Sequence, residues 1–173
     1  MKTKSITQSA ILLAIATILH LIPGFVGMVK PDFMLVFIFT IIILNKDFKT
    51  SLAVGIAGGI LAGMTTSAPG GFLPNFVDKI ISSLFVYVAV KFFEKIKMEN
   101  NFSVGFLYFI GTVISGFVFL FLMNLAGALP ESMGLGFMFV SLVIPTAGIN
   151  IFVGLFFDKI MNMYNRKIAR SIG

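Results

Sequence analysis

Long apolar runs, separated by short polar connections, are the feature that most restricts how this chain can fold. Only 12% of its residues are charged and 58% are hydrophobic, and the mean hydropathy is +1.04. A soluble domain normally carries about 25% charged residues, which cover its surface. The sequence therefore excludes a soluble globule. It predicts an all-α integral membrane protein, because a helix satisfies its own backbone hydrogen bonds within lipid.

Six such runs predict a single six-helix transmembrane domain that covers residues 1–173. The expected segments are Ser5–Ile22, Asp32–Leu44, Ser51–Met64, Pro74–Phe93, Phe102–Leu129 and Phe137–Met163. The first and the last three approach or exceed the ~20 residues with which a helix crosses a bilayer. The second and third are shorter, so we expect them either to extend into their flanking loops or to stop part-way.

Lysine and arginine gather on one side of this predicted topology. Lys30 lies in an opposite loop, and Lys79 lies within the fourth segment. Because basic residues are retained on the cytoplasmic side of a membrane, both termini are expected in the cytoplasm and the loop Thr65–Leu73 outside. The basic residues that set this orientation are Lys2, Lys4, Lys46, Lys49, Lys91, Lys95, Lys97, Lys159, Arg166, Lys167 and Arg170.

A polar stripe interrupts the fourth apolar segment and is the main candidate for a binding site. If a helix begins at Pro74, four polar residues recur at i, i+3, i+4 and i+7 and share one face. A charge inside a bilayer costs roughly 2.5–3.5 kcal/mol, so such residues turn to the protein interior and mark a ligand or ion path. The four residues are Asn75, Asp78, Lys79 and Ser82.

The start of this helix suggests how a solute would bind. Pro74 suits a first helical turn, so the amide groups of residues 75–77 would be free to hold a substrate carboxylate. Lys79 or Lys30 would reinforce that site, and Asp78 would hold an ammonium group. The result would be a clamp for an amino acid.

More polar residues and glycines belong to the same predicted end of the bundle. Gly70 and Gly71 would let the backbone approach a ligand closely. Such a concentration favours capture of a small polar or zwitterionic solute. The set comprises His20, Lys30, Asp32, Thr65, Thr66, Pro69, Gly70, Gly71, Asn124 and Glu131.

An alternative interpretation of these charges is structural. Asp78 would pair with Lys30. Lys79 would pair with Asp32 or Glu131. The ion pairs would then only join helices. That role would not explain the neighbouring glycines and threonines.

The last apolar segment offers a second set of possible ligand contacts. Pro145 would leave the carbonyl group of Ser141 without its helical partner and would bend the helix. That carbonyl and the Asn150 amide could meet an indole N–H, although a kink that only improves packing fits equally well. Four phenylalanines are expected to form an aromatic wall: Phe33, Phe37, Phe72 and Phe76.

Two rows of small residues predict close helix contacts. Gly55, Gly59 and Gly63 lie four residues apart and are expected to pack against another helix of the same chain. Ala10 and Ala14 repeat this spacing on the first helix, where they could dock a partner helix instead.

Missing residues argue against several functions. The chain has no cysteine and one histidine, so no metal site is expected. It has no phosphate-binding loop and no set of nucleophile, base and orienting residue, so neither an enzyme nor a cofactor is expected. The net charge of +6 comes from short clusters between apolar runs, which argues against binding to nucleic acid.

The motifs resemble the bacterial tryptophan-transporter family TrpP over essentially the whole chain. They are Lys30-Pro31-Asp32, Thr65-Thr66, Pro69-Gly70-Gly71, Pro74-Asn75, Asp78-Lys79, Pro145 and Asn150. The resemblance implies tryptophan uptake in a bacterial cell membrane. With the site argument above, it makes these the expected substrate-binding residues: Lys30, Asp32, Thr65, Thr66, Pro69, Gly70, Gly71, Asn75, Asp78, Lys79 and Asn150.

This family is similar in turn to the substrate-binding S components of energy-coupling-factor (ECF) transporters. Those six-helix proteins bind vitamins or related solutes outside, and a membrane-embedded coupling subunit with two ATPases moves them. Many S components carry Ala-x-x-x-Ala on the first helix as the coupling surface, so the resemblance implies partner docking at Ala10 and Ala14. The sequence leaves open a solitary carrier, an S component for a vitamin or other aromatic solute, and a structural membrane protein without a ligand.

Overall fold

The computed structural model describes residues 3–22, 30–98, 100–129 and 134–172, and these ranges form six helical segments without a strand. All six predicted segments are confirmed as helical, with ends that shift by a few residues, and the last one continues to Ile172. Its helical run comprises α6, a π-helical turn and α7. The bounds are α1 (Thr3–His20), α2 (Phe33–Asn45), α3 (Phe48–Met64), α4 (Phe72–Lys95), α5 (Asn101–Leu125), α6 (Leu135–Met138), η1 (Phe139–Val143) and α7 (Ile144–Ile172).

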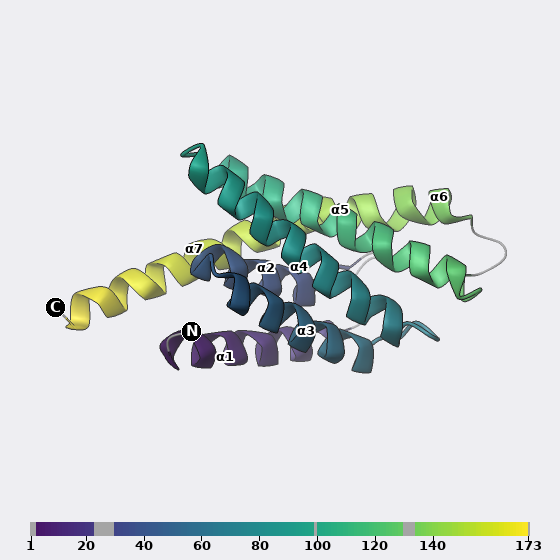
Figure 1. Cartoon of the computed structure of the whole chain (residues 1–173), viewed down its shortest axis with the longest axis horizontal. Coiled ribbons are helices and arrows are strands. Elements are labelled where there is room, and N and C mark those ends of the chain that lie inside the picture. Colours follow the sequence, from purple (N-terminus) through teal and green to yellow (C-terminus); the bar gives the residue numbers. More distant parts are fainter. Residues whose placement is uncertain (1–2, 23–29, 99, 130–133, 173) are drawn as a thin grey trace.

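The helices run along the long axis of the molecule (Figure 1). Successive segments alternate in direction, so both ends of the chain lie at the same end of the bundle. The connection between α3 and α4 and the start of α6 lie at the opposite end. Connections such as the two residues between α2 and α3 are short, which favours antiparallel neighbours.

Helix α2 forms the centre of the bundle. All residues from Met34 to Ile42 are buried, and α2 packs against α1, α3, α4, α5 and α7. A helix that is apolar on every side requires such an environment. Its 13 residues span only about 20 Å, less than the ~30 Å hydrocarbon layer of a bilayer. Of the two short segments, α2 keeps its predicted length of 13 residues, whereas α3 extends back to Phe48.

The glycine row of α3 packs against α4, as predicted. A Cβ atom added at Gly59 would lie 2.8 Å from the carbonyl oxygen of Phe76, and one at Gly55 would lie 2.9 Å from the Ser83 side chain. Only glycine allows backbones to approach this closely. The contact fixes the face that α4 turns toward the interior.

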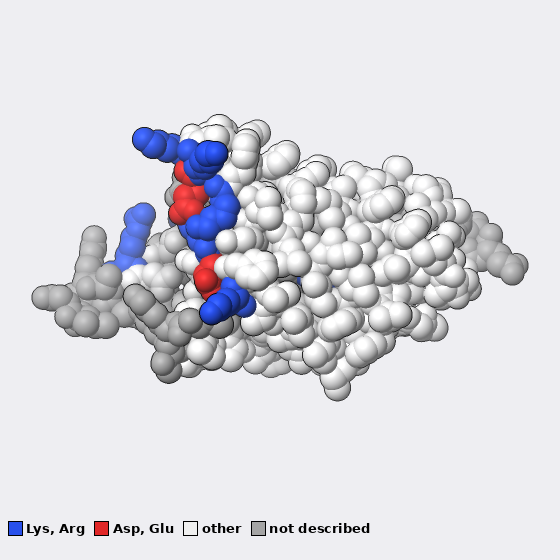
Figure 2. Space-filling model, viewed as in Figure 1, with Lys and Arg blue, Asp and Glu red and all other residues white. Residues whose placement is uncertain are grey.

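Charged side chains cluster at the end of the bundle that holds the chain termini. On the face shown in Figure 2 they form a narrow band there, and the remaining surface is almost uncharged. Within the described residues, α5 and the run Leu135–Lys167 are long and apolar enough to cross a membrane. Phe102 and Phe152 are each at least 75% exposed. Water disfavours so much apolar surface, whereas lipid accepts it.

Candidate functional site

A cavity of about 820 Å³ lies at the end of the bundle opposite the chain termini. Its volume falls in the range of roughly 300–1,000 Å³ that is typical of small-molecule sites. Side chains from α1, α2, α4, α5 and the sixth segment surround it, together with the connection between α3 and α4. The polar and charged lining residues are His20, Lys30, Asp32, Thr65, Thr66, Ser67, Asn75, Asp78, Lys79, Thr112, Ser115 and Thr146.

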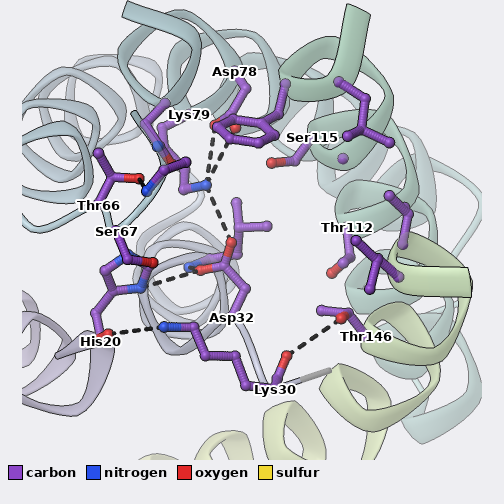
Figure 3. Close-up of a pocket in the computed structure, with 18 of the residues that line it drawn as sticks. His20, Lys30, Asp32, Thr66, Ser67, Asp78, Lys79, Thr112, Ser115 and Thr146 are labelled. Carbon is purple, nitrogen blue, oxygen red and sulfur yellow. Dashed lines mark hydrogen bonds and ion pairs between the residues drawn. The ribbon is translucent and has the colours of Figure 1, made fainter. Parts of the chain in front are cut away.

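An ionic cluster forms one wall of the cavity (Figure 3). The Nζ atom of Lys79 lies 3.0 Å from Oδ1 of Asp78 and 3.2 Å from Oδ2 of Asp32. The side chains of Lys79 and Asp78 are each only 2% exposed. The predicted pairing of Lys79 with Asp32 is therefore confirmed, whereas Asp78 pairs with Lys79 and not with Lys30. The other expected partner, Glu131, lies outside the described residues.

One carboxylate oxygen of Asp78 accepts no hydrogen bond, although it lies in an ion pair with Lys79. Its Oδ2 accepts a long hydrogen bond of 3.4 Å from Lys79. Its Oδ1 is buried and lies 3.0 Å from the same ammonium group. Ser115 faces this carboxylate from α5 (Figure 3). A buried oxygen without a hydrogen bond is costly, so it favours a ligand that donates one.

Asp32 is held in place from several sides. Its Oδ1 caps α2 by accepting the Leu35 amide at 3.0 Å, and its own amide donates to Oδ1 of Asn150 at 3.0 Å. The Nδ2 group of Asn150 donates to the Thr112 hydroxyl at 2.9 Å. Asn150 is fully buried behind the cavity and does not line it. The amide expected to contact substrate instead positions Asp32.

The expected anion site at the start of α4 is wrong. The helix begins at Phe72, and Gly71 is its N-terminal cap, so Pro74 is the third helical residue. The amide of Asn75 donates to the Gly71 carbonyl at 3.0 Å, and its side chain donates to the same oxygen at 2.8 Å. The amides of Phe76 and Val77 lie further inside the helix. Residues 75–77 therefore present no free cluster of N–H groups.

The structure brings most, but not all, of the predicted binding residues to the cavity. Pro69, Gly70 and Gly71 do not line it. Gly70 has a φ of 73°, and the Gly71 amide donates to the Ala68 carbonyl, so these residues shape the turn. Those that do line it are Lys30, Asp32, Thr65, Thr66, Asn75, Asp78 and Lys79.

The opposite wall is apolar, but its members differ from the expected phenylalanines. Phe37 lies in the core, 4.5 Å from Phe157 between ring centres, and Phe72 packs against Gly63. Phe33 and Phe76 do not line the cavity either. The wall comes from α5 and the sixth segment: Gly116, Phe119, Leu120, Met138, Leu142 and Val143.

Two backbone features bring the sixth segment against α5. A Cβ atom at Gly116 would lie 2.5 Å from the Val143 side chain, so glycine allows the close approach. In the π-helical turn, the Ile144 amide donates to the Phe139 carbonyl, five residues back, just before Pro145. Pro145 therefore lies directly after an irregular turn, where a residue that disturbs helical hydrogen bonding is expected. Ser141, whose carbonyl was expected to meet a ligand, does not line the cavity.

Several lining residues escape prediction from sequence. His20, predicted at this end of the bundle but not as a substrate-binding residue, lines the cavity, and its Nδ1 is buried without a hydrogen bond and lies 4.0 Å from Oδ1 of Asp32. Thr112 and Ser115 were also missed. Their i, i+3 spacing within an apolar helix is the same kind of signal that identified the stripe on α4. No three potential metal-ligating side chains gather anywhere in the described ranges.

We predict that Lys79→Ala lowers the free energy of unfolding by about 3–5 kcal/mol, because loss of one partner of a buried ion pair leaves uncompensated charge. A shift in the thermal-unfolding midpoint measures this effect. Lys49→Ala is the matched control, since Lys49 is exposed in the first turn of α3, away from the cavity. Adding Asp78→Asn to Lys79→Ala should restore part of the stability. Equal midpoints for the two alanine variants would contradict the prediction.

Comparison with known proteins assigns the chain to a family. The family model described as tryptophan transporter TrpP matches residues 2–166. A probable tryptophan transport protein of Clostridium perfringens is 36% identical over 96% of both chains. Proteins with the same description from Clostridium acetobutylicum and Bacillus subtilis are 36% and 37% identical, over 89% of both chains and over 87% and 86% respectively. No solved structure matches the chain. The chain belongs to the tryptophan transporter family TrpP.

Proposed function

We propose that this protein captures tryptophan from the outer side of a bacterial cell membrane for uptake. The described function of its relatives supports the substrate. The observation that carries the proposal is the division of the cavity into an ionic wall and an apolar wall. An amino acid with a large ring has the same division, so its charged groups and its indole would each meet a matching surface.

We propose a multi-pass topology with both termini in the cytoplasm. The band of basic residues lies at the end of the bundle with the termini, and the cavity lies at the opposite end. Basic residues favour the cytoplasmic side, so the cavity would open outward.

Cysteine labelling tests this topology, because the chain contains no cysteine of its own. In intact cells, a membrane-impermeant maleimide should label Ala126→Cys at the end of α5 but not Met98→Cys, which follows α4 at the opposite end. Both sites are exposed, so both should react after the cells are opened. Labelling of Met98→Cys in intact cells would reverse the proposed orientation.

Within the cavity, we assign the substrate ammonium group to Asp78. This carboxylate is buried, has an oxygen without a hydrogen bond and faces the cavity from the polar stripe of α4. The apolar wall around Phe119 would receive the indole ring. Thr65, Thr66 and Asn75 line the site beside these charges.

We predict that Asp78→Asn weakens tryptophan binding roughly 10- to 100-fold, because a hydrogen bond to a charged group contributes about 1.5–3 kcal/mol. Radiolabelled tryptophan binding to purified protein measures the loss. Asp47→Asn is a suitable control, since Asp47 caps α3 at the other end and asparagine caps equally well. Unchanged affinity in Asp78→Asn would remove Asp78 from the site.

We further propose that an ECF coupling subunit with two ATPases supplies the energy for transport. Ala10 and Ala14 are exposed on α1, which packs mainly against α2 and α3 among the described elements. The small side chains would let a partner helix approach closely.

The docking hypothesis separates binding from uptake. In cells that also produce an ECF module, Ala10→Phe with Ala14→Phe should abolish tryptophan uptake, whereas tryptophan binding to the purified variant should stay unchanged. Val88→Phe, at an exposed apolar position of α4 and away from α1, is the control for added bulk. Uptake by the wild-type chain alone in liposomes would instead establish a solitary carrier.

A further inference from the structure

Four charged side chains line the cavity in the described part of the chain, and they are not equivalent. Two are acidic and two are basic, so with a neutral His20 their charges sum to zero. They are Lys30, Asp32, Asp78 and Lys79.

Lys79 is already committed to other protein groups. It lies 3.0 Å from one carboxylate and 3.2 Å from another, and its side chain is 2% exposed. A third carboxylate beside it would meet the negative charges of Asp78 and Asp32 as well as the single ammonium. Lys79 is the first anion partner that the sequence suggests. It is therefore a residue that positions the two carboxylates of Asp78 and Asp32.

Lys30 has the opposite character. No described carboxylate lies within 4.0 Å of its Nζ atom, which donates its hydrogen bond to the carbonyl oxygen of His20 at 3.2 Å. Its own carbonyl accepts a hydrogen bond from the Thr146 hydroxyl at 3.3 Å, so its backbone is tethered to the sixth segment. Lys30 thus presents an ammonium group that forms no ion pair with a described carboxylate.

Other polar groups beside Lys30 also lack partners. The Nδ1 atom of His20 is buried and forms no hydrogen bond. The His20 side chain is 10% exposed and shares one side of the cavity with Ser67 (Figure 3). Lys30, His20 and Ser67 therefore form a polar corner, which Asp32 connects to the pair Asp78–Lys79.

We propose that Lys30 binds the carboxylate of the substrate and determines specificity for a zwitterion. This inference rests on the proposed function and on the assignment of the ammonium group to Asp78. The cavity then has one subsite for each charge and the apolar wall for the ring. A ligand with only one of the two charges leaves the other subsite unpaired in a site shielded from water, where an unpaired charge is costly.

Three ligands with the same indole ring test the proposal. Tryptophan carries both charges, tryptamine carries only the ammonium group, and indole-3-propionate carries only the carboxylate. We expect wild-type protein to bind tryptophan at least roughly tenfold more tightly than either analogue, as expected for the loss of a charged hydrogen bond. Isothermal titration of purified protein in nanodiscs measures all three affinities.

Variants assign the two charges to residues. Lys30→Met should weaken tryptophan binding roughly 10- to 100-fold and leave tryptamine binding unchanged or stronger, since tryptamine has no carboxylate to lose a partner. Lys30→Arg should keep most of the tryptophan affinity. Lys49→Met, at the opposite end, should change none of the affinities.

Each alternative outcome gives a distinct answer. If Lys30→Met binds tryptophan as wild type does, or loses tryptamine and tryptophan affinity equally, Lys30 does not bind the carboxylate and the inference is overturned. If wild-type protein binds indole-3-propionate and tryptamine as tightly as tryptophan, the requirement for a zwitterion is overturned. If wild-type protein binds tryptophan in no assay, the proposed function itself fails.

Discussion

The interaction on which the structure depends is the ammonium group of Lys79 held between two buried carboxylates. Isolated, each of these charges would be costly at this depth; together they largely compensate one another. The cluster also joins helices, because Asp32 caps α2 while Asp78 and Lys79 belong to α4. Asn150 and Thr112 extend the connection to α7 and α5 through hydrogen bonds. One ionic centre thereby fixes the relative position of four helices around the cavity.

Packing of small residues determines where this centre lies. The glycines of α3 allow one face of α4 to approach closely. The polar face of α4 is therefore turned toward α2 and α5. On the opposite side, Gly116 brings Val143 against α5 and closes the apolar wall. Close packing against glycine therefore positions both walls, the polar wall on one side of the site and the apolar wall on the other.

The number of helices and the polar face of α4 could be predicted from the sequence because both follow from the exclusion of polar groups by lipid. The start of α4 could not, since proline is tolerated at several positions of a first turn and the cap is a glycine in a turn. With 21 phenylalanines, composition cannot show which rings face a cavity; helix rotation decides it. Asn150 has both donors and acceptors, so only its contacts with Asp32 and Thr112 reveal a supporting role.

The charges of the site bear on how transport is driven. With Lys30, Asp32, Asp78 and Lys79 ionised and His20 neutral, the described lining of the empty cavity has no net charge, and a zwitterion adds none. Moving one elementary charge across a membrane potential of 100 mV changes the free energy by about 2.3 kcal/mol. A site that is neutral both empty and loaded gains nothing from that potential. A zwitterion that crosses alone therefore gains nothing from the potential, and its accumulation requires either a co-transported ion or another source of energy.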